Sequence, residues 1–359
     1  MLRITISLIL SLFILDSCSS EGDGPTANND AGSNTPFPLS QVKYFAYQLQ
    51  GLDSPGAIDK IVASGYDLVV VEPTRTDWES ETYDFDTKGM VERIKKSAAH
   101  DKAYRKLVIA YINVGEAESW RWYWTWSKEW KAGNPKPADW PSYIVYADPD
   151  GWVDNYPVLF WDTLWKNTVI YGIKTADKPY ADYNSIIDEV LKDGFDGIYL
   201  DWIEAYQDEK VAEIAKSQGI DPAYEMKEFF REMRQYAAMR NPKFIIIQQN
   251  ASNLITDAPA TLDYIDAIAQ EAVWYDGFGG FDNWDDPGGY DVLNEQGLTD
   301  YYIANLDKYK NAGKPVFNIE YAVNNSAKAY GNSAAKGYIP YCTRRCLAKL
   351  TTTPPPGLK

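Results

Sequence analysis

The chain has 359 residues, of which 45% are apolar, and its formal net charge is −16. This length is enough for one large domain or two ordinary ones, with a substantial core. The acidic balance argues against nucleic acid as a partner, because phosphate binding requires clustered Lys and Arg side chains. A neutral or cationic substrate suits the charge, and so does the plain need of an acidic surface for solubility.

Residues 1–17 are predicted to be a lipoprotein signal peptide. Arg3 supplies a positive charge, and residues 4–15 form an apolar stretch that is too short to span a bilayer comfortably. The sequence Leu15-Asp16-Ser17-Cys18 resembles the processing box of bacterial lipoproteins, so we expect Cys18 to become the lipidated first residue. An ordinary cleaved signal with an incidental cysteine is the alternative. Residues 18–39, rich in Gly, Pro, Asn and Asp, are predicted to be a disordered tether in the cell envelope.

Three similar stretches indicate the architecture of the rest of the chain. They are SGYDLVVVEP (64–73), DGFDGIYLDW (193–202) and AGKPVFNIEY (312–321). Each contains a Gly where a helical pattern ends, then a continuous apolar run, then an acid. Continuous apolar runs that alternate with helices are typical of a parallel sheet covered on both faces.

Further strands are predicted at 44–48, 107–113, 244–250 and 268–274, with a short eighth at 157–161. Helices are predicted to begin at Ser54-Pro55, at Asp221-Pro222 and at Thr299. Eight strands with intervening helices predict a (β/α)₈ TIM barrel over residues 40–350, followed by a flexible tail at 351–359. A doubly wound open sheet is the alternative, but no Gly-x-Gly-x-x-Gly follows the first strand.

The segment from Trp120 to Trp165 does not fit the repeating pattern. It holds nine of the thirteen tryptophans and is predicted to be an elaborated loop after the third strand. Because Trp buries a large area, the loop could form a satellite core. Alternatively, its indole rings could be platforms on which sugar rings stack.

The cysteine and histidine content limits the chemistry. Cys342 and Cys346 lie four residues apart in a predicted terminal helix, where a disulfide would be strained. The single histidine, His100, lies in a charged stretch away from every strand end and is expected to be solvated. This composition excludes a Ser-His-Asp triad and gives no credible zinc site, so no metal or organic cofactor is expected.

In a TIM barrel the reacting groups lie at the carboxyl ends of the strands. In this sequence those positions hold acids, amides and aromatic residues, namely Tyr47, Gln48, Glu72, Asn113, Glu116, Asp162, Asp201, Trp202, Glu204, Gln249, Asn250, Glu271 and Glu320. Glycoside hydrolysis uses such a set, because one carboxyl group protonates the leaving oxygen while a second attacks the sugar or activates water. The proton donor needs a raised pKa, which burial or a nearby carboxylate provides.

Four motifs carry a resemblance to a known family: GFDGIYLDW (194–202), VIAYINVGEAE (108–118), FNIEYA (317–322) and GYIPY (337–341). With them, residues 40–350 resemble the endo-α-1,4-polygalactosaminidases of glycoside hydrolase family 114, which are secreted barrels acting on galactosamine-rich exopolysaccharide. The resemblance implies catalysis by an Asp and a Glu at strand ends. It matches these to Asp201, as nucleophile of a retaining mechanism, and Glu271, as acid/base.

Other residues are assigned to the substrate. The candidate sugar-binding residues are Tyr47, Gln48, Glu116, Asp162, Trp202, Glu204, Gln249, Asn250 and Glu320. Glu320 is also the main rival of Glu271 as acid/base, and Glu116 is the next. A glycan-binding lipoprotein on a barrel without catalytic activity is the alternative function, because the fold does not decide the activity.

Overall fold

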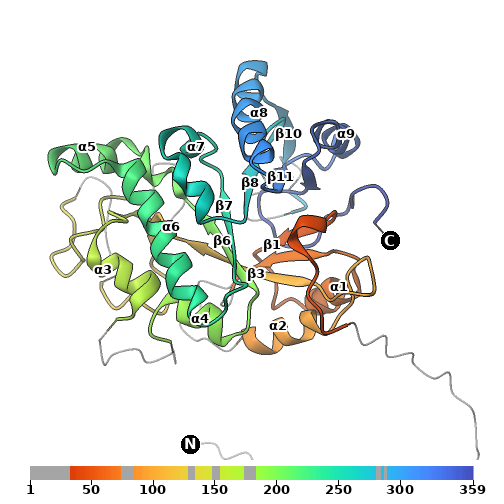
Figure 1. Ribbon diagram of the computed structural model, residues 1–359, viewed down its shortest axis with the longest axis horizontal. Coiled ribbons are helices and arrows are strands. Elements are labelled where there is room, and N and C mark those ends of the chain that lie inside the picture. The colour runs from red at the N-terminus through yellow and green to blue at the C-terminus, as the bar shows by residue number, and fades with distance from the viewer. Residues whose placement is uncertain are drawn as a thin grey trace, which may run out of the picture. The chain divides into compact units, whose positions relative to one another are not determined.

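Eight parallel strands form a nearly closed barrel in the computed structural model, which describes residues 33–73, 85–127, 134–147, 154–173, 183–279, 284–286 and 289–358 (Figure 1). In spatial order the strands are β1 (Phe45–Gln48), β2 (Leu68–Val71), β3 (Leu107–Asn113), β6 (Gly197–Asp201), β7 (Ile245–Gln249), β8 (Ala267–Glu271), β11 (Val316–Glu320) and β12 (Ile339–Cys342). Each strand pairs with the next in parallel. The predicted TIM barrel is confirmed.

Helices surround the barrel and connect its strands. They are α1 (Ala57–Ala63), α2 (Thr87–Lys95), α3 (Thr163–Lys166), α4 (Ile186–Lys192), α5 (Glu209–Ser217), α6 (Pro222–Ala238), α7 (Leu254–Asp257), α8 (Gln296–Asn311) and α9 (Ser326–Lys336). Short 3₁₀ turns lie at η1 (Leu39–Gln41), η3 (Ile203–Tyr206) and η4 (Pro259–Asp263), and η2 (Asn167–Tyr171) is a π-helical turn. Asp221 caps α6 as predicted, accepting hydrogen bonds from the backbone N–H groups of Ala223 and Tyr224. Helix α8 begins before Thr299, whose hydroxyl donates to the Val273 carbonyl at 2.8 Å instead of capping the helix.

The eighth barrel strand is β12, so the prediction of a barrel strand at 157–161 is wrong. The nearest strand there is β5 (Asn155–Pro157), which pairs antiparallel with β4 (Glu116–Glu118) in a separate small sheet. β12 is only four residues long and contains Pro340, a residue that argues against a strand in sequence. Cys342 therefore ends a strand instead of lying in a helix, and Cys346 follows in a loop; both are buried free thiols.

Aromatic residues fill the barrel interior. The centroid of the Phe45 ring lies 4.9 Å from that of Phe317 on β11 and 5.7 Å from that of Tyr341 on β12. Nearer the carboxyl ends of the strands, the ring of Tyr47 packs 5.2 Å from that of Tyr199. Successive inward positions of one strand thus contribute to successive layers, as in other TIM barrels.

Both ends of the described barrel unit are packed against it. Phe37 is buried, and its N–H donates to the Arg105 carbonyl at 3.0 Å. At the other end Thr351 donates to the Tyr341 hydroxyl at 2.9 Å, and Tyr330 donates to the Thr353 carbonyl at 2.6 Å. Residues 33–39 and 351–358 therefore differ from the predicted tether and flexible tail. Their apolar side chains find a surface on the barrel, which composition alone does not reveal.

The tryptophan-rich segment is largely a satellite core. The rings of Trp124, Trp140 and Tyr156 lie 4.8–5.2 Å from one another and are buried. Trp122 and Trp165 are also buried, and the indole of Trp165 donates to the Val114 carbonyl at 2.8 Å, just beyond β3. Partly exposed indoles remain at Trp120, Trp126 and Trp161, whereas Trp130 and Trp152 lie outside the described residues.

His100 is exposed, as predicted, but one of its ring nitrogens has a partner. Its Nδ1 contacts the carboxylate of Asp67, a buried residue that directly precedes β2. The rings of Phe37 and Tyr44 lie 5.3 and 5.2 Å from the imidazole. His100 thus packs at the amino ends of the strands, away from the strand ends that hold the acids.

Within the described residues, no helix has the length and apolar character to cross a bilayer.

Candidate active site

Two carboxylates lie at inward-facing positions where barrel strands end. Asp201 is the last residue of β6 and Glu271 the last residue of β8, with β7 between them. Burial and the negative charge of Glu271 raise the pKa of Asp201 to about 7, although hydrogen bonds from Tyr111 and Trp202 oppose this rise. The structure therefore brings the predicted pair together at the barrel mouth.

Two donors orient Asp201. The Tyr111 hydroxyl donates to Oδ2, and the Trp202 backbone N–H donates to Oδ1 at 2.7 Å. Trp202 has a φ of 57°, in the left-handed region that only Gly adopts without strain. Gly115 makes room for this turn, because a Cβ atom there would lie 2.0 Å from the Trp202 carbonyl oxygen.

Glu271 is held by Tyr321 and Asn250. The Tyr321 hydroxyl donates to Oε1 at 2.5 Å, and the Asn250 side-chain amide donates to Oε2 at 3.1 Å. Asn250 Oδ1 in turn accepts the backbone N–H of Glu271 at 2.9 Å and the Gln270 amide at 3.0 Å. Asn250 was predicted to bind a sugar hydroxyl, but its contacts make it a residue that positions Glu271.

Backbone strain gathers at the same place. The non-glycine residues with positive φ in the described parts of the chain are Asp154, Trp202, Asn250, Ala251, Ala272 and Leu347. Four of these six directly follow β6, β7 or β8. Strained residues of this kind persist where the surrounding structure holds them, often at active sites.

A floor of tyrosines lies beneath the two carboxylates. Tyr47, Tyr111 and Tyr199 point into the barrel, and the Tyr47 hydroxyl contacts Gln249 Oε1 at 3.4 Å. Burial raises the pKa of all three tyrosines well above the ordinary value, and the nearby carboxylates add to the effect. Their hydroxyl groups thus stay protonated and neutral. Tyr111, Tyr199 and Tyr321 were not predicted from sequence, although Tyr199 lies two residues before Asp201 on the same face of β6.

Further acids surround this pair. Glu204 lies on η3, and Asp276 lies on β9 (Tyr275–Phe278). Burial, with smaller contributions from Asp201 and Glu271, raises the pKa of Glu204 to about 8. Burial also raises the pKa of Tyr302 on α8, and the charges of Glu204, Asp276 and Glu271 add to the rise, which places Tyr302 among these acids.

Buried ion pairs build the opposite wall of the mouth. Arg121 contacts Glu72, and its Nε lies 2.5 Å from Glu118 Oε2. The charges of Glu118 and Glu72 both raise the pKa of Tyr111, so this group lies beside the Asp201 partner. Two carboxylates thus share the Arg121 guanidinium.

The sequence profile of glycoside-hydrolase family GH114 matches residues 26–355 of this chain. The chain belongs to this family. It is therefore a glycoside hydrolase, and its barrel and strand-end acids agree with the resemblance seen in sequence.

Similar proteins extend over most of the chain. An uncharacterized protein of Deinococcus radiodurans is 30% identical over 364 residues, covering 97% of this chain and 99% of that protein. The uncharacterized protein MJ1477 of Methanocaldococcus jannaschii is 29% identical, covering 84% of this chain and 75% of its own.

Two solved structures share the fold. The glycoside hydrolase domain of PelA from Pseudomonas aeruginosa is 14% identical, with a TM-score of 0.55 over 86% of this chain and 97% of that domain. Ega3 of Aspergillus fumigatus, solved in complex with galactosamine, is 16% identical, with a TM-score of 0.54 over 87% of this chain and 95% of that one. Both support the TIM barrel of this GH114 protein.

Three residues predicted for the GH114 site point elsewhere. Glu320 is fully buried on the outward face of β11, and its carboxylate accepts N–H groups of Val273 at 3.1 Å and Tyr275 at 2.6 Å. Gln48 donates to the carbonyl groups of Gln50 and Ala348, and Asp162 caps α3 through the N–H of Leu164. The alternation of a strand explains Glu320, because the next residue, Tyr321, takes the inward position.

Glu116 also has a structural position. It lies on β4, and its Oε2 accepts the side-chain amides of Asn113 at 2.9 Å and Asn155 at 3.1 Å. These contacts join the end of β3 to the small β4–β5 sheet. Glu116 therefore ties the Trp-rich segment to the barrel.

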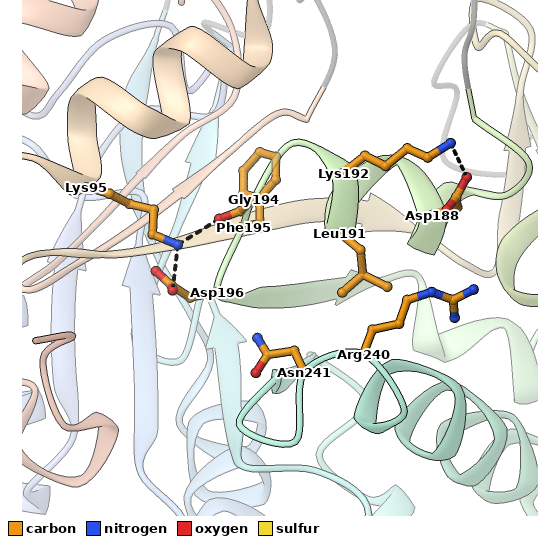
Figure 2. Close-up of a pocket in the computed structure, with 9 residues that line it drawn as sticks. All are labelled: Lys95, Asp188, Leu191, Lys192, Gly194, Phe195, Asp196, Arg240 and Asn241. Atoms are coloured by element: carbon orange, nitrogen blue, oxygen red, sulfur yellow. Dashed lines mark hydrogen bonds and ion pairs between the residues drawn. The ribbon is translucent and has the colours of Figure 1, made fainter. Parts of the chain in front are cut away.

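A cavity at the other end of the barrel is lined by Lys95, Asp188, Leu191, Lys192, Gly194, Phe195, Asp196, Arg240 and Asn241 (Figure 2). Two ion pairs join four of its charged groups. Lys95 lies 3.0 Å from Asp196 and donates to the Gly194 carbonyl, while Lys192 pairs with Asp188 at 2.9 Å. Asp196 precedes β6, so this cavity lies at the amino ends of the strands, where TIM barrels carry stabilising contacts and not catalysis.

Proposed function

We propose that this glycoside hydrolase cleaves a polysaccharide containing galactosamine-type amino sugars, with Asp201 and Glu271 as its reacting carboxyl groups. The observation that carries this proposal is the pair itself. The two acids face the mouth of the barrel, and the charge of Glu271 raises the pKa of Asp201. Each acid accepts hydrogen bonds from a tyrosine hydroxyl and from a second donor. Such prior orientation lowers the cost of reaching the transition state.

In the proposed retaining mechanism, Asp201 attacks the anomeric carbon while Glu271 gives its proton to the leaving glycosidic oxygen. A covalent glycosyl–Asp201 ester forms as the glycosidic bond breaks. Glu271 then takes a proton from water, whose oxygen attacks the anomeric carbon and frees Asp201. The hydrogen bonds from Tyr111 and Trp202 favour the ionised form of Asp201, which is the form that attacks.

The acids around the pair favour an amino sugar. Glu204, Glu271 and Asp276 gather near Tyr302, and Asp201 lies near Glu271 and Glu204. A neighbouring cation, Arg345, is paired with Asp276. An ammonium group on the sugar would be attracted to this mouth and would favour the ionised form of Glu204. The galactosamine bound to Ega3, a protein of the same fold, agrees with this substrate class.

Release of reducing ends from a panel of polymers tests the proposal. The panel includes α-1,4-linked galactosamine polymer, its N-acetylated form, chitosan and a neutral galactan. We expect release from the amino-sugar polymers above all. Binding to a polymer without release, at every pH from acidic to neutral, would instead identify a glycan-binding lipoprotein.

We expect activity to fall as pH rises through about 7. Below the raised pKa of Asp201 the two carboxyl groups together retain the one proton that departure of the sugar oxygen requires, and above it that proton is lost. The measurement is kcat/KM against pH, which should drop about tenfold per pH unit on the alkaline side.

Tyr111→Phe should shift the alkaline limb of this pH profile. The variant removes a hydrogen bond that lowers the pKa of Asp201, so the alkaline limb should move upward by roughly half to one pH unit. Tyr206→Phe is the matched control, because Tyr206 donates to Asp257 at 2.9 Å, outside the site. An alkaline limb that stays in place or moves downward in Tyr111→Phe would contradict the shared proton.

We further propose that Cys18 carries a lipid that holds the enzyme in a bacterial cell envelope. The apolar segment 4–15 and the sequence Leu15-Asp16-Ser17-Cys18 support this localisation. Cys18→Ala should leave the membrane fraction or remain unprocessed, whereas Ser20→Ala should behave as the wild type. Unchanged membrane association of Cys18→Ala would rule out anchoring through this residue.

A further inference from the structure

Exposed apolar side chains concentrate in one region of the described residues. The described residues include nine exposed large apolar side chains, and five of the nine lie between 278 and 301, namely Phe278, Tyr290, Leu293, Leu298 and Tyr301. Soluble proteins seldom leave a contiguous apolar patch open without a binding role. This region comprises β9, its antiparallel partner β10 (Tyr290–Leu293) and the start of α8.

The two faces of the β9–β10 ribbon differ. Gly277 packs on the barrel rim, where an added Cβ would lie 2.9 Å from the Cβ of Tyr321, and its cross-strand partner Asp291 pairs with Arg344. The other face carries Phe278 opposite Tyr290, with ring centroids 5.1 Å apart. Phe278 is 59% exposed and Tyr290 52%, so this aromatic pair is open to solvent.

This aromatic face continues into the active site. Asp276 lies two residues before Phe278 on the same face of β9, and its charge acts on Tyr302 together with those of Glu271 and Glu204. β9 itself begins four residues after Glu271, and the Tyr321 N–H donates to the Tyr275 carbonyl at 3.2 Å. The aromatic pair therefore lies a few residues along the chain from Glu271, with the acid Asp276 between them in sequence.

We propose that Phe278 and Tyr290 form a stacking platform for sugar units of the polymer that lie beyond the cleaved bond, on the Glu271 side of the mouth. The proposal rests on the glycosidase function and specifies how that site holds a long substrate. A pyranose ring presents an apolar C–H face, which suits a flat pair of rings, and polar edges, which suit neighbouring acids. A second copy of this chain or a lipid surface would not require the platform to adjoin the catalytic acids.

Affinity electrophoresis through gels containing α-1,4-linked galactosamine polymer measures the platform directly. The full chain carries Asp201→Asn in every sample, so that the polymer is not digested during the run. Adding Phe278→Ala and Tyr290→Ala together should weaken retardation by the polymer about tenfold, the effect of losing one strong interface anchor. Adding Tyr171→Ala, an exposed tyrosine on η2 that contacts Glu232, should leave retardation unchanged.

The outcomes separate the platform from the enzyme. Equal retardation with and without the aromatic pair overturns the platform, even if the wild type releases reducing ends. Wild type that neither binds nor cleaves any polymer overturns the proposed function and the platform together. Two further assays test other occupants: light scattering for self-association, and sedimentation with phosphatidylglycerol vesicles for lipid binding. If either interaction is lost on removing Phe278 and Tyr290 while polymer retardation persists, the face binds another occupant and the proposal is overturned.

Discussion

Asp201→Asn is expected to lower kcat by more than about 10³-fold while the protein stays folded and still binds polymer. The amide keeps the size of the carboxylate. Its oxygen can still accept the Trp202 N–H, and its N–H₂ group can donate to the Tyr111 hydroxyl, which rotates to accept. It cannot attack the anomeric carbon, because it lacks the negative charge. Release of reducing ends, circular dichroism and affinity electrophoresis measure these three properties separately.

Glu320→Gln is the matched control for this loss. Glu320 is also a buried strand-end carboxylate, and burial raises its pKa to about 7, but its oxygens accept the N–H groups of residues 273–275. Its amide would set an N–H₂ group against one of those donors and cost about 1–3 kcal/mol of stability. We therefore expect a lower melting temperature with kcat reduced only a few-fold. Near-normal turnover in Asp201→Asn, with a collapse of turnover in folded Glu320→Gln, would reverse the assignment.

The barrel and the reacting pair could be predicted because their signals are local. Apolar runs that end in an acid mark β2, β6 and β11, and Asp201 and Glu271 each end such a run. Long-range contacts gave no such signal. The tyrosines that hold the carboxylates come from β3 and from the residue after β11, and only the closed barrel brings Tyr111 to Asp201 and Tyr321 to Glu271.

Strand alternation decided which strand-end residues belong to the site. Glu320 and Gln48 satisfy the rule that reacting groups lie at strand ends, but both point away from the barrel interior. Extending the inward positions of β11 from Phe317 through Ile319 leads to Tyr321 and not to Glu320. The eighth strand escaped prediction for a different reason, since four residues including Pro340 carry too little apolar periodicity.

The leaving group distinguishes the role of Glu271 from that of Asp201. Glu271→Gln should lower kcat/KM for the polymer by about 10²–10⁴-fold, because the glycosidic oxygen of a sugar must be protonated as it departs. An aryl glycoside with a nitrophenolate leaving group needs no proton, so formation of the covalent intermediate should be reduced far less in this variant.

The Gln oxygen can still accept the Asn250 side-chain amide, and its N–H₂ group can donate to the Tyr321 hydroxyl, which rotates to accept, so the position of the group is preserved. Pre-steady-state release of nitrophenolate, followed by slow turnover, is the expected signature, because the second step still needs a base to activate water. Added azide should speed that second step, since it attacks the anomeric carbon without losing a proton. Asp201→Asn should show no burst of nitrophenolate, and azide should not restore its turnover by this route, because no covalent intermediate forms. If Glu271→Gln loses polymer and aryl substrates to the same extent and azide restores neither, then Glu271 is not the proton donor, and Glu204, the other acid at the mouth with a raised pKa, is the next residue to test.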